Sequence, residues 1–441
     1  MKKTPMEDWI IQRTGISSAN QDALEAYQLN KLIETLNYAK QNSVFYERHL
    51  ADFECEDLKS LADFKQLPFT QTADIKESPF SFLCVSQTKV DRIVTLNTSG
   101  TSGKKKRIFF TDKDLQQTVD FFNYGMRSLT DSTDRVLVLL PGQAYGTIGD
   151  LLQKALNQSQ TACTVFGLLT DLEAVEKSIL ENDINCIIGI PIQLLYLSRM
   201  KSEAFKKIEK ILLSTDYVPQ VLIDELNQKF DCQVFNHYGM TEMGYGGGVE
   251  CQALNGYHLR EGDLYFEIID PDSGQPLADG EYGEVVFTTF NREAMPLIRY
   301  RTGDIGAFST EPCTCGTFLR TLKKVEGRLG NRLQLSESGW CDLKVMEELI
   351  LEFEEIIDYQ VILENNEALT INITLYDIGD EDIIRKQVVQ KIQGYFLKHY
   401  QLLMNVKINI NWEQRPDQMI NSMIKRKIVD QRKEHRDEGF F

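Results

Sequence analysis

The sequence lacks any apolar run near the roughly 20 residues that an α-helix needs to cross a bilayer. The start, from Met1 to Trp9, contains two lysines but no apolar core of a secretory signal after them. Cysteine is also scarce, since the 441 residues include nine, an odd number spread thinly along the chain. A disulfide framework is therefore excluded. These absences argue against a membrane or secreted protein and predict a protein of the cytoplasm.

Positive charge is in short supply as well, because 48 lysines and arginines stand against 65 acidic residues, a net charge of -17. This balance excludes a general surface for nucleic acid or for an anionic membrane, and we expect neither partner. The hydrophobic share of 42% and the charged share of 26% are those of a globular protein, and the length predicts two or more domains. The four cations at Lys104–Arg107 therefore need an explanation of their own.

These cations end a stretch of small residues between two apolar segments, Ile93–Leu96 and Ile108–Phe110, which we interpret as the end of one buried strand and the start of another. The small residues are Thr98, Ser99, Gly100, Thr101, Ser102 and Gly103. Glycines let backbone N–H groups close on an anion, hydroxyls add donors, and lysine supplies a charge. The pattern predicts a phosphate-binding loop, although not of the Walker form. A polar hairpin with a basic tip is the alternative.

Apolar spacing predicts helices first and then a parallel sheet. Residues 21–50 have apolar positions at helical spacing, so we expect an N-terminal helical region within residues 1–60. Between Asp114 and Asn236, helical segments alternate with short apolar strands. This alternation is typical of an α/β domain with a mostly parallel, helix-covered sheet.

The pattern changes twice in the second half of the chain. From Tyr257 to about residue 325, strands separated by turn residues predict a smaller antiparallel β subdomain. After Gly327-Arg328 helices and strands mix again, so we place a short hinge there. Residues 1–327 are then a large N-terminal domain, and residues 328–441 are a small α+β C-terminal domain.

Four short motifs occur in order along the chain. They are Thr98–Gly103 with Lys106, Tyr238-Gly-Met-Thr-Glu242, Tyr300-Arg-Thr-Gly-Asp304 and Gly327-Arg328. Together they resemble the motifs of adenylate-forming enzymes, which include acyl-CoA synthetases, peptide-synthetase adenylation domains and luciferase. Within these the chain is most similar to the phenylacetate-CoA ligase family, in its short length and in the block from Pro296 to Asp304. The resemblance covers nearly the whole chain and implies a large AMP-binding domain with a small mobile C-terminal domain.

The resemblance implies an enzyme that joins a small carboxylic acid, of the aryl class, to ATP, releases pyrophosphate and passes the acyl group to coenzyme A. Carboxylate and triphosphate repel each other, so such a site must supply positive charge and orientation. The implied cofactors are ATP, Mg²⁺ and coenzyme A. Two alternatives stay open: loading of the acyl group onto a carrier protein, and a nucleotide-binding regulatory protein without turnover. A homodimer is compatible with any of them.

By resemblance, the loop Thr98–Gly103 and Lys106 hold the β- and γ-phosphates. Glu242 binds Mg²⁺, a hard cation that prefers carboxylate and phosphate oxygens, and Thr241 bonds the α-phosphate. Lys106, Thr241 and Glu242 are thus the candidate catalytic residues of the large domain. The structural alternative for Glu242 is an ordinary carboxylate at the start of a helix.

The resemblance also implies the groups that hold the nucleoside. Tyr238, followed by Gly239 of the same motif, stacks on adenine, and Asp304 accepts hydrogen bonds from both ribose hydroxyls. Arg328 reaches the ribose or a phosphate from the hinge. A core aromatic side chain is the alternative for Tyr238, and the carboxylate of an ordinary turn is the alternative for Asp304.

The chain departs from the family pattern at three places. The family usually has Thr where Ser102 stands and Pro where Lys105 stands, so the hydroxyl is kept and a charge is added. The family tends to end with Gly-Lys before a basic run, and that lysine completes the adenylation site. The tail Asn421–Asp430 lacks the glycine. An ungapped match puts Ile424 at the lysine position, and a shift of one residue puts Lys425 there. We take Lys425 as the catalytic candidate, with a solvated basic tail as the alternative.

Three cysteines and a histidine form a candidate metal site. Cys251 and His258 flank Asn255-Gly256, a hairpin-type turn that brings the two side chains near each other. Cys313 and Cys315 lie in a tight knuckle later in the chain. Three Cys and one His are a common ligand set for structural zinc. The alternative is four unrelated reduced side chains.

Overall fold

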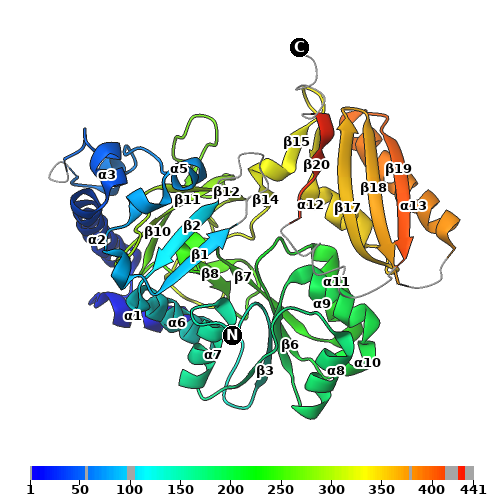
Figure 1. The fold of residues 1–441 in the computed structure, drawn as a ribbon, viewed down its shortest axis with the longest axis horizontal. Coiled ribbons are helices and arrows are strands. Elements are labelled where there is room, and N and C mark those ends of the chain that lie inside the picture. The colour runs from blue at the N-terminus through cyan, green and yellow to red at the C-terminus, as the bar shows by residue number, and fades with distance from the viewer. Residues whose placement is uncertain (1, 55–57, 97–104, 377–379, 413–425, 433–441) are drawn as a thin grey trace. The chain divides into compact units, whose positions relative to one another are not determined.

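The computed structural model describes residues 2–54, 58–96, 105–376, 380–412 and 426–432. The chain forms two compact units that alternate along the sequence. Unit 1 consists of Met1–Asp134, Pro141–Val165 and Phe235–Val325, and unit 2 consists of Arg135–Leu140, Phe166–Val234 and Glu326–Phe441. Figure 1 labels their helices and strands. The division into domains at residues 327–328 stays a prediction.

Unit 1 begins with helices α1 (Pro5–Thr14), α2 (Gln21–Asn42) and α3 (Val44–His49). The Thr4 hydroxyl caps α1 by accepting from Met6 N, and Asn20 caps α2 by accepting from Ala23 N. Such caps satisfy N–H groups that have no partner inside the helix. Shorter helices follow: α4 (Leu61–Phe64), α5 (Thr72–Glu77), η2 (Pro79–Phe82) and η3 (Gln87–Lys89).

A hairpin of β1 (Arg92–Leu96) and β2 (Lys106–Phe110) flanks the predicted phosphate loop, with Leu96 opposite Lys106. The loop residues Thr98–Gly103 lie outside the described residues. β2 is largely buried, but β1 is not, since the Ile93 side chain is 48% exposed. The prediction of a buried strand at Ile93–Leu96 is therefore wrong. Among the described residues β1 pairs with β2 alone, so it is an edge strand whose residues are half-buried or exposed.

Helix α6 (Asp112–Met126) starts next to β2 with a capping box of Thr111 and Asp114. The Asp114 carboxylate also accepts from Glu293 N at 2.7 Å and Ala294 N at 3.0 Å, which ties the start of α6 to the turn after β11 (Gly283–Thr289). Helix α7 (Ile148–Gln158) packs on α6, and β4 (Ala162–Val165) follows it.

Two groups of antiparallel strands complete unit 1. In one, β7 (Gln233–Tyr238), β8 (Gly248–Glu250), β9 (Tyr257–Leu259) and β13 (Thr321–Leu322) are neighbours in that order. In the other, β10 (Leu264–Ile269), β11 and β12 (Tyr300–Gly306) are neighbours. The antiparallel pairing predicted from Tyr257 onward is confirmed.

Unit 2 contains three parallel strands, β3 (Arg135–Leu139), β5 (Cys186–Gly189) and β6 (Lys210–Leu213). Between these strands in the chain lie α8 (Leu172–Glu181), α9 (Pro191–Met200) and α10 (Ser202–Phe205), and α11 (Gln220–Phe230) follows β6. Every residue of β5 is buried, as expected of a strand covered on both faces. The predicted α/β class with a parallel sheet is confirmed.

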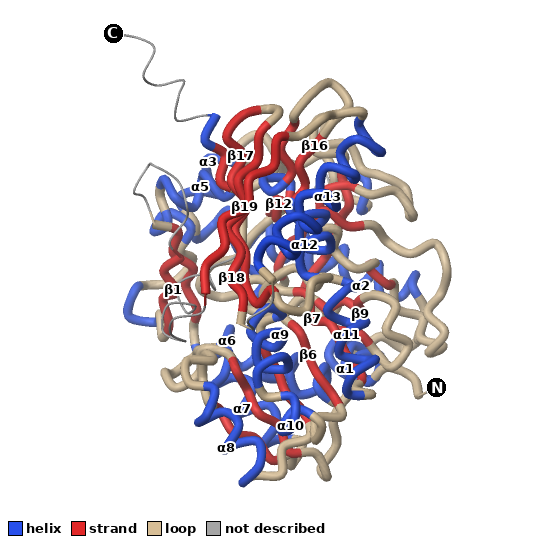
Figure 2. Tube along the Cα trace, turned by 90° about the vertical axis from the view of Figure 1, so that its right-hand side faces the viewer, coloured by secondary structure: helices blue, strands red, loops and turns tan. Residues whose placement is uncertain are grey.

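The C-terminal part of unit 2 is a four-stranded sheet with two helices. Strands β17 (Ile356–Asn365) and β18 (Ala368–Leu375) pair antiparallel, while β19 (Asn405–Trp412) and β20 (Val429–Asp430) join them in parallel. Helices α12 (Leu343–Leu351) and α13 (Glu381–Tyr400) lie beside this sheet (Figure 2). Small elements precede α12: β14 (Gly327–Arg328), η5 (Leu329–Asn331), β15 (Arg332–Gln334) and β16 (Trp340–Asp342). No helix among the described residues combines the length and apolar composition of a membrane span.

One buried carboxylate stands out in the turn between β9 and β10. The Glu261 side chain is buried, and its Oε2 atom has no hydrogen-bond partner among the described residues. The same is true of Oε1 of Gln21, which interacts with Glu261. Burial raises the pKa of Glu261 to about 7, and the nearby Arg320 opposes the shift only in part. A proton on Glu261 is therefore favoured in the folded protein.

We expect Glu261→Gln to raise the free energy of unfolding by about 1–3 kcal/mol at pH 8 and to change it little at pH 5. The folded carboxyl keeps its proton up to a pKa of about 7, whereas the ordinary carboxyl pKa is 4.5, so stability falls as pH rises between these values. Glutamine does not ionise and escapes this loss. Denaturant unfolding at both pH values measures the difference, with Glu34→Gln at an exposed ion pair as control. An equal effect at pH 5 and pH 8 would contradict the assignment.

Candidate active site

The centre of the site is a buried ion pair between Lys106 and Glu242 in unit 1. Lys106 is the first residue of β2 and Glu242 lies in η4 (Thr241–Met243), and both side chains are at least nine-tenths buried. Lys106 Nζ donates to Glu242 Oε1. The Tyr300 hydroxyl, at the start of β12, lies 3.3 Å from both of these atoms. Tyr300 is held in turn by Thr72, whose Oγ1 atom is 2.6 Å from the hydroxyl.

This arrangement keeps two opposite charges ready in a place from which water is largely excluded. Burying either charge alone would cost several kcal/mol. The Lys106 ammonium and the Glu242 carboxylate can therefore be buried only as a pair. A carboxylate is the ligand that Mg²⁺ prefers, and an ammonium group pairs with phosphate. The carboxylate of this pair therefore suits the Mg²⁺ of a magnesium–nucleotide complex, and the ammonium suits its phosphates.

Glycine positions explain how the chain presents Glu242. A Cβ atom on Gly239 would lie 2.2 Å from the carbonyl oxygen of Tyr245, so only glycine fits where the backbone folds back on itself. Gly244, with φ of 74°, ends the short helix in the left-handed region. The Thr118 hydroxyl donates to Gly244 O at 2.8 Å and fixes this turn against α6. The spacing of the motif is thus set by backbone geometry.

A second group joins Tyr238 and Asp304, the predicted nucleoside residues. The Tyr238 hydroxyl donates to Asp304 Oδ2 at 3.1 Å, and both side chains are buried. Tyr257 of β9 packs beside Tyr238, with 5.7 Å between the ring centroids and a tilt of 33°. The Thr302 hydroxyl supports Asp304 by accepting from its backbone N–H at 3.0 Å. A phenol and a carboxylate in contact provide a stacking surface and an acceptor at one place.

His237, which precedes the motif, packs among the rings of Phe121 and Phe122, with centroid distances of 6.2 and 6.0 Å. Burial lowers the pKa of His237 to about 4, so the imidazole is neutral at pH 7. The surroundings suit a wall of the site rather than an acid–base group.

Cys251, His258, Cys313 and Cys315 come together as the sequence predicts. Their ligand atoms all lie within 4.8 Å of one another. Cys251 Sγ is 3.7 Å from Cys313 Sγ and 3.3 Å from His258 Nε2, which is 3.6 Å from Cys315 Sγ. The cause is strand pairing, because β9 carries His258 beside β8 on one side and β13 on the other.

The structure describes Arg328 and Thr241 but not the remaining predicted residues. Thr98–Gly103 and Lys425 lie outside the described residues. Arg328 is half-buried in β14 and belongs to unit 2. Thr241 opens η4 and is half-buried beside Glu242.

Tyr300 is the functional candidate that sequence reasoning did not single out. It heads a motif in which only the terminal Asp304 received a role. In a regular strand, residues two apart lie on one face, and Tyr300, Thr302 and Asp304 are buried members of an alternation of buried and half-buried residues along β12. This period of two was the signal available in the sequence.

Comparison with known proteins agrees with this site. The family of AMP-binding enzymes matches residues 26–291. A phenylacetate-coenzyme A ligase of Aromatoleum evansii is 30% identical, covering 72% of this chain and 73% of that protein. The phenylacetate-coenzyme A ligase of Escherichia coli strain K12 is 27% identical, covering 77% and 79%. Among solved structures, a 2-hydroxyisobutyryl-CoA ligase in the postadenylation state has a TM-score of 0.78 at 16% identity, covering 94% of this chain and 90% of that chain. This likeness shows the fold.

The fold, the motifs and the match define an adenylate-forming enzyme of the AMP-binding family. Within that family the chain belongs to the branch of the phenylacetate-CoA ligases. It is an AMP-forming acyl- or aryl-CoA ligase, which uses ATP and coenzyme A.

Glu242→Gln keeps the size of the side chain and removes its charge, so we expect ATP-dependent turnover to fall by about 10²-fold or more. Binding of ATP without Mg²⁺ should persist, because Lys106 is then released from its partner. Pyrophosphate release and nucleotide titration with and without Mg²⁺ measure the two effects. Near-normal adenylation by a folded variant would show that this carboxylate has another role.

Proposed function

We propose that this ligase activates a small aryl carboxylic acid as its acyl-adenylate and transfers the acyl group to coenzyme A. The buried Lys106–Glu242 pair beside Tyr300 is the observation that carries the proposal. An aryl acid is supported by the phenylacetate-coenzyme A ligases among the relatives. A carrier protein as acceptor and a homodimer stay predictions, as does the cytoplasm.

In the proposed first step, a carboxylate oxygen of the acid attacks the α-phosphorus of ATP and pyrophosphate leaves. Lys106 would neutralise the phosphates together with the loop Thr98–Gly103, while Glu242 would hold Mg²⁺ and Thr241 the α-phosphate. Lys106 and Glu242 could exchange partners in this step: the Glu242 carboxylate would hold Mg²⁺ in place of Lys106, and the Lys106 ammonium would pair with phosphate in place of Glu242. The buried charges then remain compensated throughout.

The nucleoside would be held by the second group. Tyr238 offers a ring face to adenine, and Asp304 accepts from ribose hydroxyls in addition to the Tyr238 hydroxyl. Gly239 would form the backbone turn beside them, Arg328 would bind the ribose or a phosphate, and Lys425 would complete the adenylation site. In the second step the thiolate of coenzyme A attacks the acyl carbonyl carbon, a thioester forms and AMP leaves.

Pyrophosphate release across a panel of acids tests the proposal directly. With ATP and Mg²⁺, we expect phenylacetate and related aryl acids to give turnover that rises with coenzyme A, and short aliphatic acids to give at least about 10-fold less. Thioester formation by mass spectrometry identifies the product. Turnover that responds to a phosphopantetheinylated carrier protein but not to coenzyme A would favour the carrier alternative. Nucleotide binding without pyrophosphate release for any acid would contradict the proposal.

We also propose that Cys251, His258, Cys313 and Cys315 bind one structural zinc ion. Tetrahedral ligands at about 2.3 Å from zinc are about 3.8 Å apart, and the distances of 3.3–3.7 Å between ligand atoms fit this geometry. Three buried or half-buried thiols with one imidazole are the chemistry that zinc prefers.

Purified protein never exposed to a chelator should contain about one equivalent of zinc, and Cys313→Ser should lower both metal content and thermal stability. Cys163→Ser is the matched control, because Cys163 is also half-buried in unit 1 but lies outside the cluster. Metal analysis by mass spectrometry and thermal unfolding give the two measurements. Metal content well below half an equivalent in the parent protein would rule the site out.

A further inference from the structure

Helix α12 is attached to the rest of unit 2 by polar contacts at its C-terminal end. Arg199, on α9, has a side chain only 1% exposed. Its guanidinium donates to Leu351 O at 2.9 Å, to Phe353 O at 3.2 Å and to Ile356 O. It also pairs with both carboxylate oxygens of Glu225 on α11. The last carbonyl groups of a helix lack partners inside it, so Arg199 caps α12 from a distant segment.

A side chain of α12 in turn caps the N-terminal end of α11. Glu348, on α12, accepts from Gln220 N at 2.7 Å and from Val221 N at 3.0 Å, the first N–H groups of α11. Pro219 precedes that helix and offers no side-chain cap. The Tyr217 hydroxyl donates to the same Glu348 carboxylate at 3.0 Å. Each of these two helices therefore depends on the other segment for its free backbone groups.

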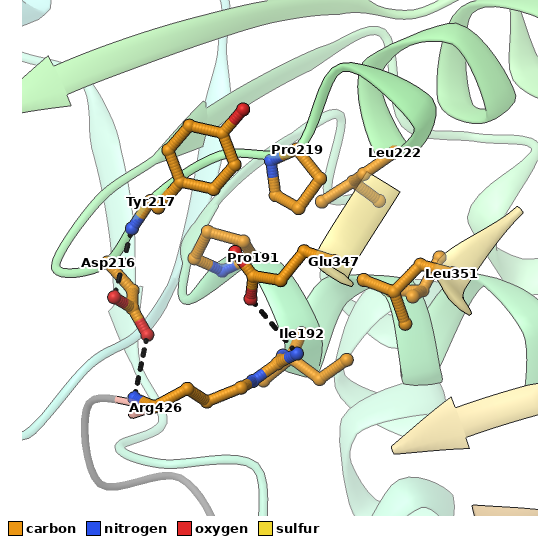
Figure 3. A pocket seen from close by; sticks show the side chains of 10 residues that line it. Pro191, Ile192, Asp216, Tyr217, Pro219, Leu222, Glu347, Leu351 and Arg426 are labelled. Atoms are coloured by element: carbon orange, nitrogen blue, oxygen red, sulfur yellow. Dashed lines mark hydrogen bonds and ion pairs between the residues drawn. The ribbon is translucent and has the colours of Figure 1, made fainter. Parts of the chain in front are cut away.

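Arg426 makes a third contact within unit 2, with residues of the loop after β6 and of α12 (Figure 3). Arg426 donates from its backbone N–H to Asp216 Oδ2 at 3.4 Å, and its guanidinium lies 3.2 Å from Glu347 Oε1. The guanidinium also lies 4.8 Å from the centre of the Tyr359 ring. The cavity between these side chains, Pro219 and Leu222 has a volume of about 10 Å³, room for no more than one water molecule. The contact surface is thus closely packed.

The loop that makes these contacts, Ser214–Pro219, occupies a position where function is expected. It follows the carboxyl end of β6, and ligands of parallel α/β sheets bind at that edge. Thr215 has φ of 79°, a left-handed conformation that is strained for a β-branched residue. Such strain persists where the surroundings enforce it, and it gathers at functional sites. Asp216 and Tyr217, the next two residues, are those that reach the C-terminal part.

We propose that Arg199 and Glu348 form a latch that positions the C-terminal segment, of which residues 326–376, 380–412 and 426–432 are described, on α9 and α11 and sets the balance between the two half-reactions. The proposal rests on the proposed function, because only an enzyme with two half-reactions has such a balance. Adenylation requires cations at the α-phosphate, whereas thioester formation requires open access for a thiol to the same acyl-adenylate. A segment held in one place serves one of these demands better. Arg199 and Glu348 are therefore positioning residues.

The test uses Glu348→Gln and Arg199→Lys in the full chain. Glutamine keeps the shape but removes the charge that caps α11, and lysine cannot reach three carbonyls and Glu225 at once. Glu354→Gln is the matched control, because Glu354 pairs with Lys229 of α11 through an exposed contact at 2.8 Å. Exposed pairs of this kind contribute little.

Adenylation is measured as pyrophosphate release from ATP and phenylacetate without coenzyme A, and thioester formation by mixing phenylacetyl-adenylate with enzyme and coenzyme A. We expect both latch variants to change the ratio of the two rates by about 10-fold in the same direction, and the control to leave it unchanged. A merely structural role would lower stability and both rates together. An unchanged ratio in folded variants would overturn the proposal.

Hydrogen exchange supplies a readout that does not depend on catalysis. In Glu348→Gln, the amides of Gln220 and Val221 should exchange at least about 10-fold faster than in the parent, and in Glu354→Gln they should not. Unchanged exchange would overturn the latch even if the enzyme is active. Faster exchange in a protein that adenylates no acid would uphold the contacts and place the failure in the proposed function.

Discussion

The buried pair of Lys106 and Glu242 is the contact on which the rest of the site depends. Two charges in a place closed to water are tolerable only together, so β2 and the turn after β7 must meet at one spacing. The hairpin fixes one side and the backbone turn at Gly239 fixes the other. In the proposed function a nucleotide with Mg²⁺ would exchange partners with this pair, so that neither charge would be left buried alone.

Sequence patterns predicted the elements around this pair better than the pair itself. Periods of two and of 3.6 residues are local, so β5, β6, α12 and α13 could be predicted from their own residues. The contact between Lys106 and Glu242 joins residues 136 positions apart, and no local period reports it. The motif resemblance marked both side chains, but it assigned them to different ligands. Tyr300 was missed because attention went to the end of its motif rather than to the strand face.

Local sequence signals predicted the cysteine cluster correctly but not the burial of β1. Asn255-Gly256 is a turn signal strong enough to bring Cys251 and His258 together, and Gly256 does have φ of 97°. The turn that contains Cys313 and Cys315 lies close to these two residues because β13, which follows it, pairs with β9. For β1, the apolar residues Ile93–Leu96 indicated a strand but not its depth. Burial is decided by which strands lie alongside, and short apolar runs do not contain that information.

The attachment of α12 shows why some functional features escape sequence reasoning. Helix caps are usually sought within a few residues of the helix end, yet α11 is capped by Glu348 and α12 by Arg199, both distant in sequence. Polar caps also differ from apolar contacts in the free energy that is needed to separate them. A hydrogen bond to a charged group that is exchanged for water changes the free energy by only about 1.5–3 kcal/mol, whereas separation of an apolar surface costs energy over its whole area. A segment that must be held firmly and yet released is therefore better fastened by satisfied helix ends than by a larger core.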